Sequence, residues 1–319
     1  MRLKVTGGRA TLRAASAAGL LLLLAACATP QYRAIEQQPG DLPPRASVDD
    51  VPFIAQEVLY CGPAALAMTL NWAGVDTSQA EVADQVYTPG RDGTLPSDLL
   101  SGARRNGVLA VKVASLRDLL AEIEAGHPVL VFQNLGLSFW PQWHFAVATG
   151  YDLEQDTLTL HSGTQADHVT DLNSFSRTWQ RADNWAITVT PPDRLPQRAD
   201  AAAILSGAAG LERAGHSSAA RQAYQALSER WPENVTAWMG LGNTSYQLEQ
   251  HDRAIESFRA ALDIKPEYAP AWNNLAYSLL QVGQHEAAVA AARRAVEFAG
   301  DEAERYRQTL AEIETGTGN

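Results

Sequence analysis

Two residues of this 319-residue chain, Cys61 and His144, have surroundings suited to catalysis. Cys61 is followed by Gly-Pro at the start of an alanine-rich apolar segment, CGPAALAMTLNWAG, which has the composition of a buried helix. A helix N-terminus supplies partial positive charge and free backbone N–H groups, and both favour a thiolate over a thiol. His144 opens an apolar run, HFAVATGYD, that is typical of a strand. A thiol and an imidazole brought together could perform nucleophilic catalysis on an acyl group.

The only other cysteine of the sequence lies at the end of an N-terminal signal. Basic residues precede the apolar stretch AASAAGLLLLLAA, which ends in LAAC, residues 24–27. This pattern resembles a bacterial lipobox, which implies cleavage before Cys27 and acylation of that residue, with Ala28 directing the protein to the outer membrane. The alternative is an ordinary secretory signal with Cys27 near its cleavage site. Acylation would leave Cys61 without a disulfide partner in an oxidising compartment, so its thiol must be buried or used.

The patterning after this signal divides the rest of the chain. Residues 1–26 are predicted as a lipoprotein signal peptide, and residues 27–50, rich in proline and charge, as an acylated flexible tether. Residues 51–192 place helical segments first and the strand-like runs PVLVFQN, HFAVATGYD and DTLTLHSG second, which predicts an α+β domain. Residues 193–314 are almost wholly helical in pattern, so an all-α domain is predicted there.

The helical domain has a repeat of 34 residues. One copy starts at Pro232 with PENVTAWMGLGN and the next at Pro266 with PEYAPAWNNLAY, and tryptophan, leucine and alanine recur in phase. This period is the signature of tetratricopeptide repeats. Residues 198–231 are interpreted as a degenerate first repeat, because Gly207 stands where the others have leucine, and residues 301–314 as a capping helix.

Stacked helix pairs of this kind form a concave groove. The first helix of a repeat often faces that groove, and Asn243, Asn273 and Asn274 lie near such positions. The repeats are therefore predicted to bind a peptide segment of a protein partner.

The motifs around the cysteine and histidine resemble those of papain-like cysteine peptidases of the bacteriocin-leader-processing, double-glycine type. The resemblance covers residues 51–165 and is carried by QEVLYCGPAALAM, which starts at Gln56, and by HFAVATGYD. It implies a papain-like fold in which Cys61 is the nucleophile, His144 the general base and later acid, and Gln56 an oxyanion-hole donor. The order of lipobox, peptidase and repeats also resembles a group of proteobacterial lipoprotein peptidases.

One position departs from that family. An Asp-Pro pair usually ends the strand after the histidine strand, whereas this chain has Ser162-Gly163 there. Ser162 is the first candidate for a third catalytic member, with Asp152 and Asp167 as alternatives. A hydroxyl can accept the imidazole N–H and fix its tautomer, but it does not stabilise an imidazolium as a carboxylate does.

Other features favour simpler interpretations. His161 and His168 have no clustered carboxylates or free cysteine beside them, so no metal and no cofactor are predicted. The aromatic stretch SFWPQWHF, residues 138–145, could line a cleft or pack as an ordinary loop. The net charge of −11 excludes a nucleic-acid-binding surface, which needs a basic excess.

Together these patterns predict a periplasm-facing outer-membrane lipoprotein of a bacterium with two membranes, held by the lipid on Cys27. Its papain-like domain would hydrolyse a peptide bond of a peptide or protein substrate through a thiolate–imidazolium pair of Cys61 and His144. Its repeats would bind a peptide or protein partner. Two alternatives remain: an amidase or acyltransferase acting on a cell-envelope amide, and a non-catalytic lipoprotein scaffold.

Overall fold

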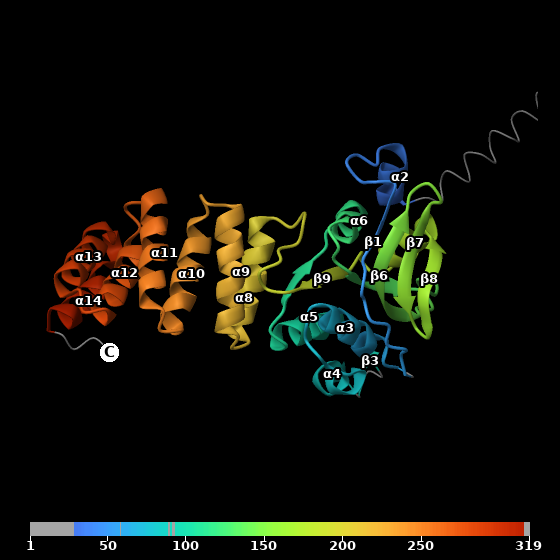
Figure 1. The fold of residues 1–319 in the computed structure, drawn as a ribbon, viewed down its shortest axis with the longest axis horizontal. Coiled ribbons are helices and arrows are strands. Elements are labelled where there is room, and N and C mark those ends of the chain that lie inside the picture. The colour runs from blue at the N-terminus through green and yellow to red at the C-terminus, as the bar shows by residue number, and fades with distance from the viewer. Residues whose placement is uncertain (1–28, 58, 89, 91–92, 316–319) are drawn as a thin grey trace, which may run out of the picture.

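The computed structural model describes residues 29–57, 59–88, 90 and 93–315, and it consists of an α+β domain followed by a row of paired helices (Figure 1). The signal peptide and Cys27, predicted to be acylated, lie outside these residues. Within the described part, no helix combines the length and the apolar character that crossing a membrane requires.

The α+β domain is built on a seven-stranded sheet in which all neighbouring strands that pair are antiparallel. Its strand order is β4-β9-β5-β6-β7-β8, and β1 pairs with β6 beside this path. The strands are β1 (Arg45–Ser47), β4 (Leu109–Lys112), β5 (Val129–Asn134), β6 (Trp143–Asp152), β7 (Thr157–Ser162), β8 (Gln165–Asp171) and β9 (Ala186–Thr190). A separate short hairpin pairs β2 (Tyr87–Thr88) with β3 (Gly93–Thr94).

Helices cover both faces of the sheet, and each face has its own buried core. Along β6, Phe145 and Val147 pack with the first helical layer, whereas Ala146 and Ala148 pack with the second. This alternation is the period of two that a strand imposes on its side chains. The first layer contains α3 (Cys61–Trp72), α4 (Gln79–Val86) and α5 (Pro96–Arg105), and the second contains α2 (Pro30–Gln37), α6 (Leu116–Glu124) and α7 (Leu172–Gln180).

The prediction of a flexible tether is wrong for residues 29–50, which fold onto the domain. Thr29 caps α2, and Tyr32 and Ile35 are buried against the second helical layer. The Tyr32 hydroxyl donates to Asp156 Oδ2 at 2.8 Å, in the turn between β6 and β7. The sequence pattern did not predict this folded arm, because its buried residues are few and widely spaced. Each is buried by tertiary contacts and belongs to no periodic apolar run.

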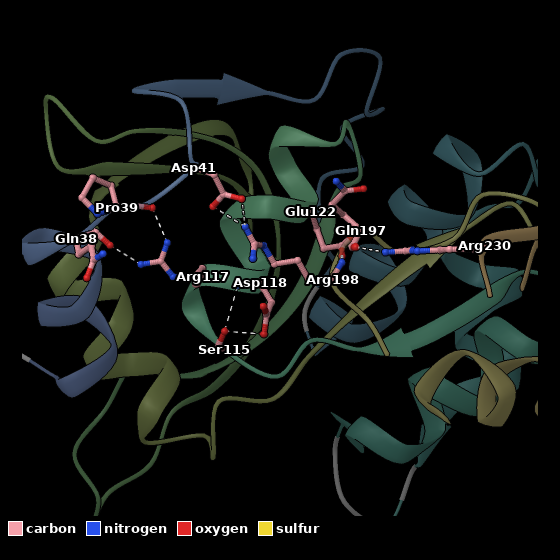
Figure 2. A network of polar contacts seen from close by, with 10 residues as sticks. All are labelled: Gln38, Pro39, Asp41, Ser115, Arg117, Asp118, Glu122, Gln197, Arg198 and Arg230. Atoms are coloured by element: carbon pink, nitrogen blue, oxygen red, sulfur yellow. Dashed lines mark hydrogen bonds and ion pairs between the residues drawn. The ribbon is translucent and has the colours of Figure 1, made fainter. Parts of the chain in front are cut away.

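Arginine side chains hold the end of this arm and the interdomain linker in place (Figure 2). Arg117 of α6 donates to the carbonyl groups of Gln38 and Pro39. Arg198 of the linker, residues 191–200, pairs with Asp41 at 2.6 Å, while its backbone N–H donates to Glu122 at 3.2 Å. These contacts join three segments that are far apart in the sequence.

The helical region confirms the tetratricopeptide prediction. Helices pair in sequence order, and the last helix packs on the pair before it as a cap. The helices are α8 (Ala201–Arg213), α9 (Ser217–Arg230), α10 (Val235–Gln247), α11 (His251–Ile264), α12 (Ala269–Gln281), α13 (His285–Phe298) and α14 (Ala303–Thr315), with a short 3-10 turn, η2 (Gly300–Glu302), before the last.

The first helix pair docks through α8 on the sheet of the α+β domain, which explains why its sequence is degenerate. Leu109 and Val111 of β4 share a buried cluster with Ile204 and Leu211 of α8. A Cβ atom at Gly207 would lie 2.7 Å from Leu109 Cδ1, so the leucine found in the other repeats does not fit there. The α+β domain thus takes the place of a preceding repeat for this array.

Candidate active site

The predicted nucleophile, base and oxyanion donor line one cavity. This cavity of about 670 Å³ is bordered by Gln56, Cys61 and His144, and it lies between the start of α3, the β2–β3 hairpin and the start of β6. The remaining lining residues carry no charge: Leu59, Gly93, Thr94, Leu95, Pro96, Phe132, Trp143 and Phe145. Gln56 and His144, 88 positions apart in the sequence, therefore meet in an uncharged cleft.

Cys61 is the first residue of α3, and the N–H of Ala64 closes the first turn onto Tyr60 O at 2.9 Å. The glycine that follows the cysteine is required by the β2–β3 hairpin. A Cβ atom at Gly62 would lie 2.9 Å from Thr94 Cβ, so a side chain there would displace the hairpin that forms one wall of the cleft.

Burial controls the ionisation of both groups. Burial raises the pKa of the Cys61 thiol, although hydrogen bonds from the backbone of Phe145, Gly62 and Cys61 itself act in the opposite direction. Burial also lowers the pKa of His144. Both directions favour a neutral thiol and a neutral imidazole, because a low-dielectric site disfavours the charged forms.

Both pKa shifts act against the thiolate–imidazolium pair predicted from the sequence. The helix N-terminus does stabilise a thiolate, as expected, but desolvation is the larger effect on Cys61. Within the described part of the chain, no hydrogen bond joins Cys61 to His144. Catalytic hydrogen bonds are often long before substrate binds, so this geometry is compatible with a base that acts during the reaction.

Ser162 lies beside the imidazole, at the end of β7. Its Oγ is 2.8 Å from His144 Nε2. In the tautomer where Nε2–H donates to Ser162, Nδ1 is the nitrogen that can accept a proton. The contact arises because β6 and β7 are antiparallel neighbours, which brings the start of one strand to the end of the other.

Neither alternative aspartate contacts the imidazole. Asp152 ends β6, eight residues beyond His144 and so about 26 Å away along the strand, where it lies 3.7 Å from Arg45. Asp167 Oδ1 lies 3.6 Å from Nδ1 of a different histidine, His161. The proposal of Asp152 as the third member is therefore wrong, and Ser162 is the side chain that the fold places on His144.

Gln56 is held by the turn that follows Ser162. Its backbone N–H donates to Gly163 O at 3.0 Å, and its side-chain amide carbon lies 4.0 Å from the position that a Cβ of Gly163 would take. Gly163 has φ +63°, a left-handed conformation that glycine adopts without strain. Ser162 and Gly163, at the end of β7 and in the β7–β8 turn, thus contact His144 and Gln56, a role that the sequence signalled only through its Ser-Gly pair.

The aromatic stretch before His144 is divided between cleft and surface. Trp143 lines the cleft and stacks on Phe132 with ring centroids 5.2 Å apart. Phe139 and Trp140, at the tip of the β5–β6 loop, are 83% and 72% exposed. The stretch therefore lines the cleft at one end, and the side chains of Phe139 and Trp140 at its tip are exposed.

The repeat groove contains the asparagines singled out from the sequence. Asn274 donates to Asn243 at 2.8 Å, and Asn273 donates to Asn274 at 3.2 Å. A cavity of about 240 Å³ beside them is lined by α8, α10, α11 and α12 residues: Glu212, Asn243, Tyr246, Gln247, Phe258, Asn274 and Tyr277. No group of histidine, cysteine or carboxylate side chains suited to a metal ion occurs among the residues that the structure describes.

Family models match both regions of the chain. Residues 48–187 match the model described as the Peptidase_C39 like family, and residues 205–269 and 245–313 match two tetratricopeptide-repeat models. The chain therefore carries a C39-like peptidase domain followed by tetratricopeptide repeats, which suit protein or peptide binding. No curated protein matches the chain.

Solved structures resemble each region separately. A structure titled as a C39-like peptidase from Bacillus anthracis is 19% identical, with a TM-score of 0.42, and the alignment covers 48% of this chain and 99% of that one. The type III secretion translocator chaperone SycD of Yersinia enterocolitica is 22% identical, with a TM-score of 0.34, and covers 35% of this chain and 81% of its own.

Proposed function

We propose that this chain is a cysteine peptidase of the double-glycine type whose nucleophile is Cys61 and whose general base is His144. The observation that carries the proposal is the convergence of Gln56, Cys61 and His144 on one uncharged cleft, with Ser162 bonded to the imidazole. Such a cleft suits a peptide backbone with uncharged side chains next to the cleaved bond.

In the proposed reaction, Cys61 Sγ attacks the carbonyl carbon while its proton passes to Nδ1 of His144. The oxygen of the carbonyl becomes negatively charged and accepts a hydrogen bond from the side-chain amide of Gln56. The imidazolium then gives the proton to the leaving amine, the C–N bond breaks, and the acyl group remains on sulfur as a thioester. Water, deprotonated by His144, hydrolyses the thioester and restores the thiol.

The neutral resting pair gives Ser162 a defined part in this scheme. When Ser162 accepts from Nε2–H, this hydrogen bond holds the imidazole in the tautomer whose Nδ1 can accept the thiol proton. Because Ser162 carries no charge, the imidazolium formed during attack gains less stabilisation than it would beside a carboxylate. The site therefore depends on positioning more than on electrostatic stabilisation of the base.

The lipobox-like sequence supports acylation of Cys27 and anchoring to the outer membrane, with the peptidase in the periplasm. Thr29, two residues later, is buried and bonded to Ser176 Oγ at 2.5 Å, so the chain between lipid and domain spans at most about 7 Å. Tyr32 attaches this arm at the β6–β7 turn, the end of the sheet opposite to His144. The cleft would then face away from the bilayer.

Metabolic labelling with a fatty acid tests the anchor: it should mark the wild type, but not Cys27→Ser, and the labelled protein should fractionate with membranes.

The groove beside Asn243 and Asn274 is proposed to bind a peptide segment of a protein partner, because asparagine side chains can bond an extended backbone through both their donor and their acceptor atoms.

A peptidyl vinyl sulfone tests the peptidase directly, since it traps an activated cysteine beside a substrate cleft. It should label the wild type at Cys61 and leave His144→Ala unlabelled, and periplasmic peptides should differ between cells with Cys61 and with Cys61→Ala. If the vinyl sulfone does not label Cys61 and the periplasmic peptides do not differ, the result would favour the non-catalytic scaffold. Labelling without a peptide difference would favour an amidase or acyltransferase.

A further inference from the structure

A second histidine, His161, lies buried next to the candidate site without touching the proposed reacting groups. It precedes Ser162 on β7, and its ring packs edge-on against Phe53 with centroids 5.5 Å apart. Its Nε2 lies 3.1 Å from the backbone carbonyl of Val51. The proposed reaction assigns no role to this side chain.

The surroundings of His161 define its tautomer. The backbone N–H of Asp167 donates to Nδ1 at 3.3 Å, so Nδ1 is an acceptor and the ring proton is on Nε2. Nε2–H is then the donor to Val51 O. Asp167 can present its N–H in this way because it has φ +51° at an irregularity in the β7–β8 pairing.

Val51 begins the stretch that leads to the oxyanion donor. Between residues 49–55 and the rest of the described chain, one hydrogen bond is formed, the bond from His161 to Val51. The next bond along the chain is from Gln56 N to Gly163 O. Both bonds come from the same β7–β8 hairpin, so the hairpin holds the stretch at its two ends and determines where Gln56 enters the cleft.

We propose that His161 is a positioning residue for Gln56, acting through the carbonyl of Val51. The inference rests on the proposed function, in which the Gln56 amide receives the developing negative charge. Three consecutive residues of one hairpin then have three tasks: His161 holds Val51, Ser162 holds His144, and Gly163 holds Gln56. A misplacement of about 1 Å in such a donor can cost up to about 100-fold in rate.

A pair of amide variants separates the two ring nitrogens. Glutamine can place its side-chain N–H near Nε2 and keep the bond to Val51, whereas asparagine reaches only the position of Nδ1. The probe is the 4-nitrophenyl ester of benzyloxycarbonyl-glycine, whose good leaving group makes it reactive towards thiol hydrolases. His161→Asn should lower kcat/KM about 10-fold, and His161→Gln should stay within about 3-fold of the wild type.

His168→Asn is the matched control, because His168 is an exposed histidine on the neighbouring strand β8. It should hydrolyse the ester at the wild-type rate. Alkylation of Cys61 by iodoacetamide forms no oxyanion, so its rate should be the same in His161→Asn as in the wild type. An equal slowing of alkylation and hydrolysis would show general disruption of the site and would overturn the proposal.

A double-mutant cycle identifies the residue through which His161 acts. In a Gln56→Ala background, His161→Asn should cause no further loss of kcat/KM. A loss that persists there would mean that His161 acts through Ser162 and His144 instead. If the wild type does not turn over the ester, the proposed function fails; if Gln56→Ala lowers the rate and His161→Asn does not, only the positioning role fails.

Discussion

The candidate active site and the repeat groove are built in opposite ways. The site brings together residues 56, 61, 144 and 162 from a loop, a helix end and two strands, so it exists only because non-local strand pairing is correct. The groove is built from helices that contact mainly their neighbours in sequence. A small shift in one strand therefore removes the site, whereas a repeat array tolerates local change.

The junction between the two regions combines a repeat helix with a strand of the sheet. The first repeat has Gly207 where the other repeats have leucine, and the absence of a side chain there lets α8 approach β4. The packing that the missing leucine would provide within the repeat is replaced by the contact of α8 with Leu109 and Val111 of β4. Irregularity in a repeat is thus informative about what it docks against.

The largest expected effect is confined to the non-local site. Cys61→Ala removes the nucleophile and should lower hydrolysis of the benzyloxycarbonyl-glycine ester by about 10⁴-fold or more. Its thermal unfolding, followed by circular dichroism, should stay within a few degrees of the wild type, because the change removes one sulfur atom at a partly exposed position. Hydrolysis by Cys61→Ala near the wild-type rate would show that Cys61 is not the nucleophile.

The next effect tests the junction. Gly207→Leu restores the repeat pattern but overlaps Leu109, and it should reduce the free energy of unfolding by about 1–3 kcal/mol. Ser206→Leu adds the same side chain at an exposed position of the same helix and is the control. Equal denaturation midpoints for the two variants in urea would contradict the docking account.

Changes at Ser162 should be smaller. Ser162→Ala loses a neutral hydrogen bond worth about 1 kcal/mol, so kcat/KM for the ester should fall about 10-fold or less. Ser162→Asp supplies the family's carboxylate and should preserve or raise the rate. Asp152→Ala should leave it unchanged, and a large loss there would return Asp152 to the site.

The pH dependence of alkylation gives the smallest but most specific signal. Because burial raises the pKa of Cys61, the rate constant for iodoacetamide should still be climbing at about pH 8.5, the ordinary pKa of a thiol. His144→Ala should change this profile little, since the directions of both pKa shifts favour a neutral resting pair. A plateau reached near pH 4, lost in His144→Ala, would instead indicate a resting ion pair.

Most of the fold could be predicted from the sequence, because the patterns that indicate helices, strands and repeats are local. The repeat period and the change from helical to strand periodicity predicted both domains, and the motifs around Cys61 and His144 located three cleft residues, Gln56 among them. The folded arm at residues 29–50, the part of the β7–β8 turn in holding Gln56, and the dominance of burial over the helix N-terminus were not predicted. Each depends on tertiary contacts that leave no periodic pattern in the chain.

The proposed reaction requires a covalent intermediate at Cys61 formed with the help of His144. Mass spectrometry of the protein, acid-quenched during turnover of the benzyloxycarbonyl-glycine ester, measures this directly. We expect one acyl group, located on the peptide that contains Cys61, with its formation slowed by at least about 100-fold in His144→Ala. Turnover with no acyl group on Cys61, or acylation at the same rate without the imidazole, would contradict the proposed site.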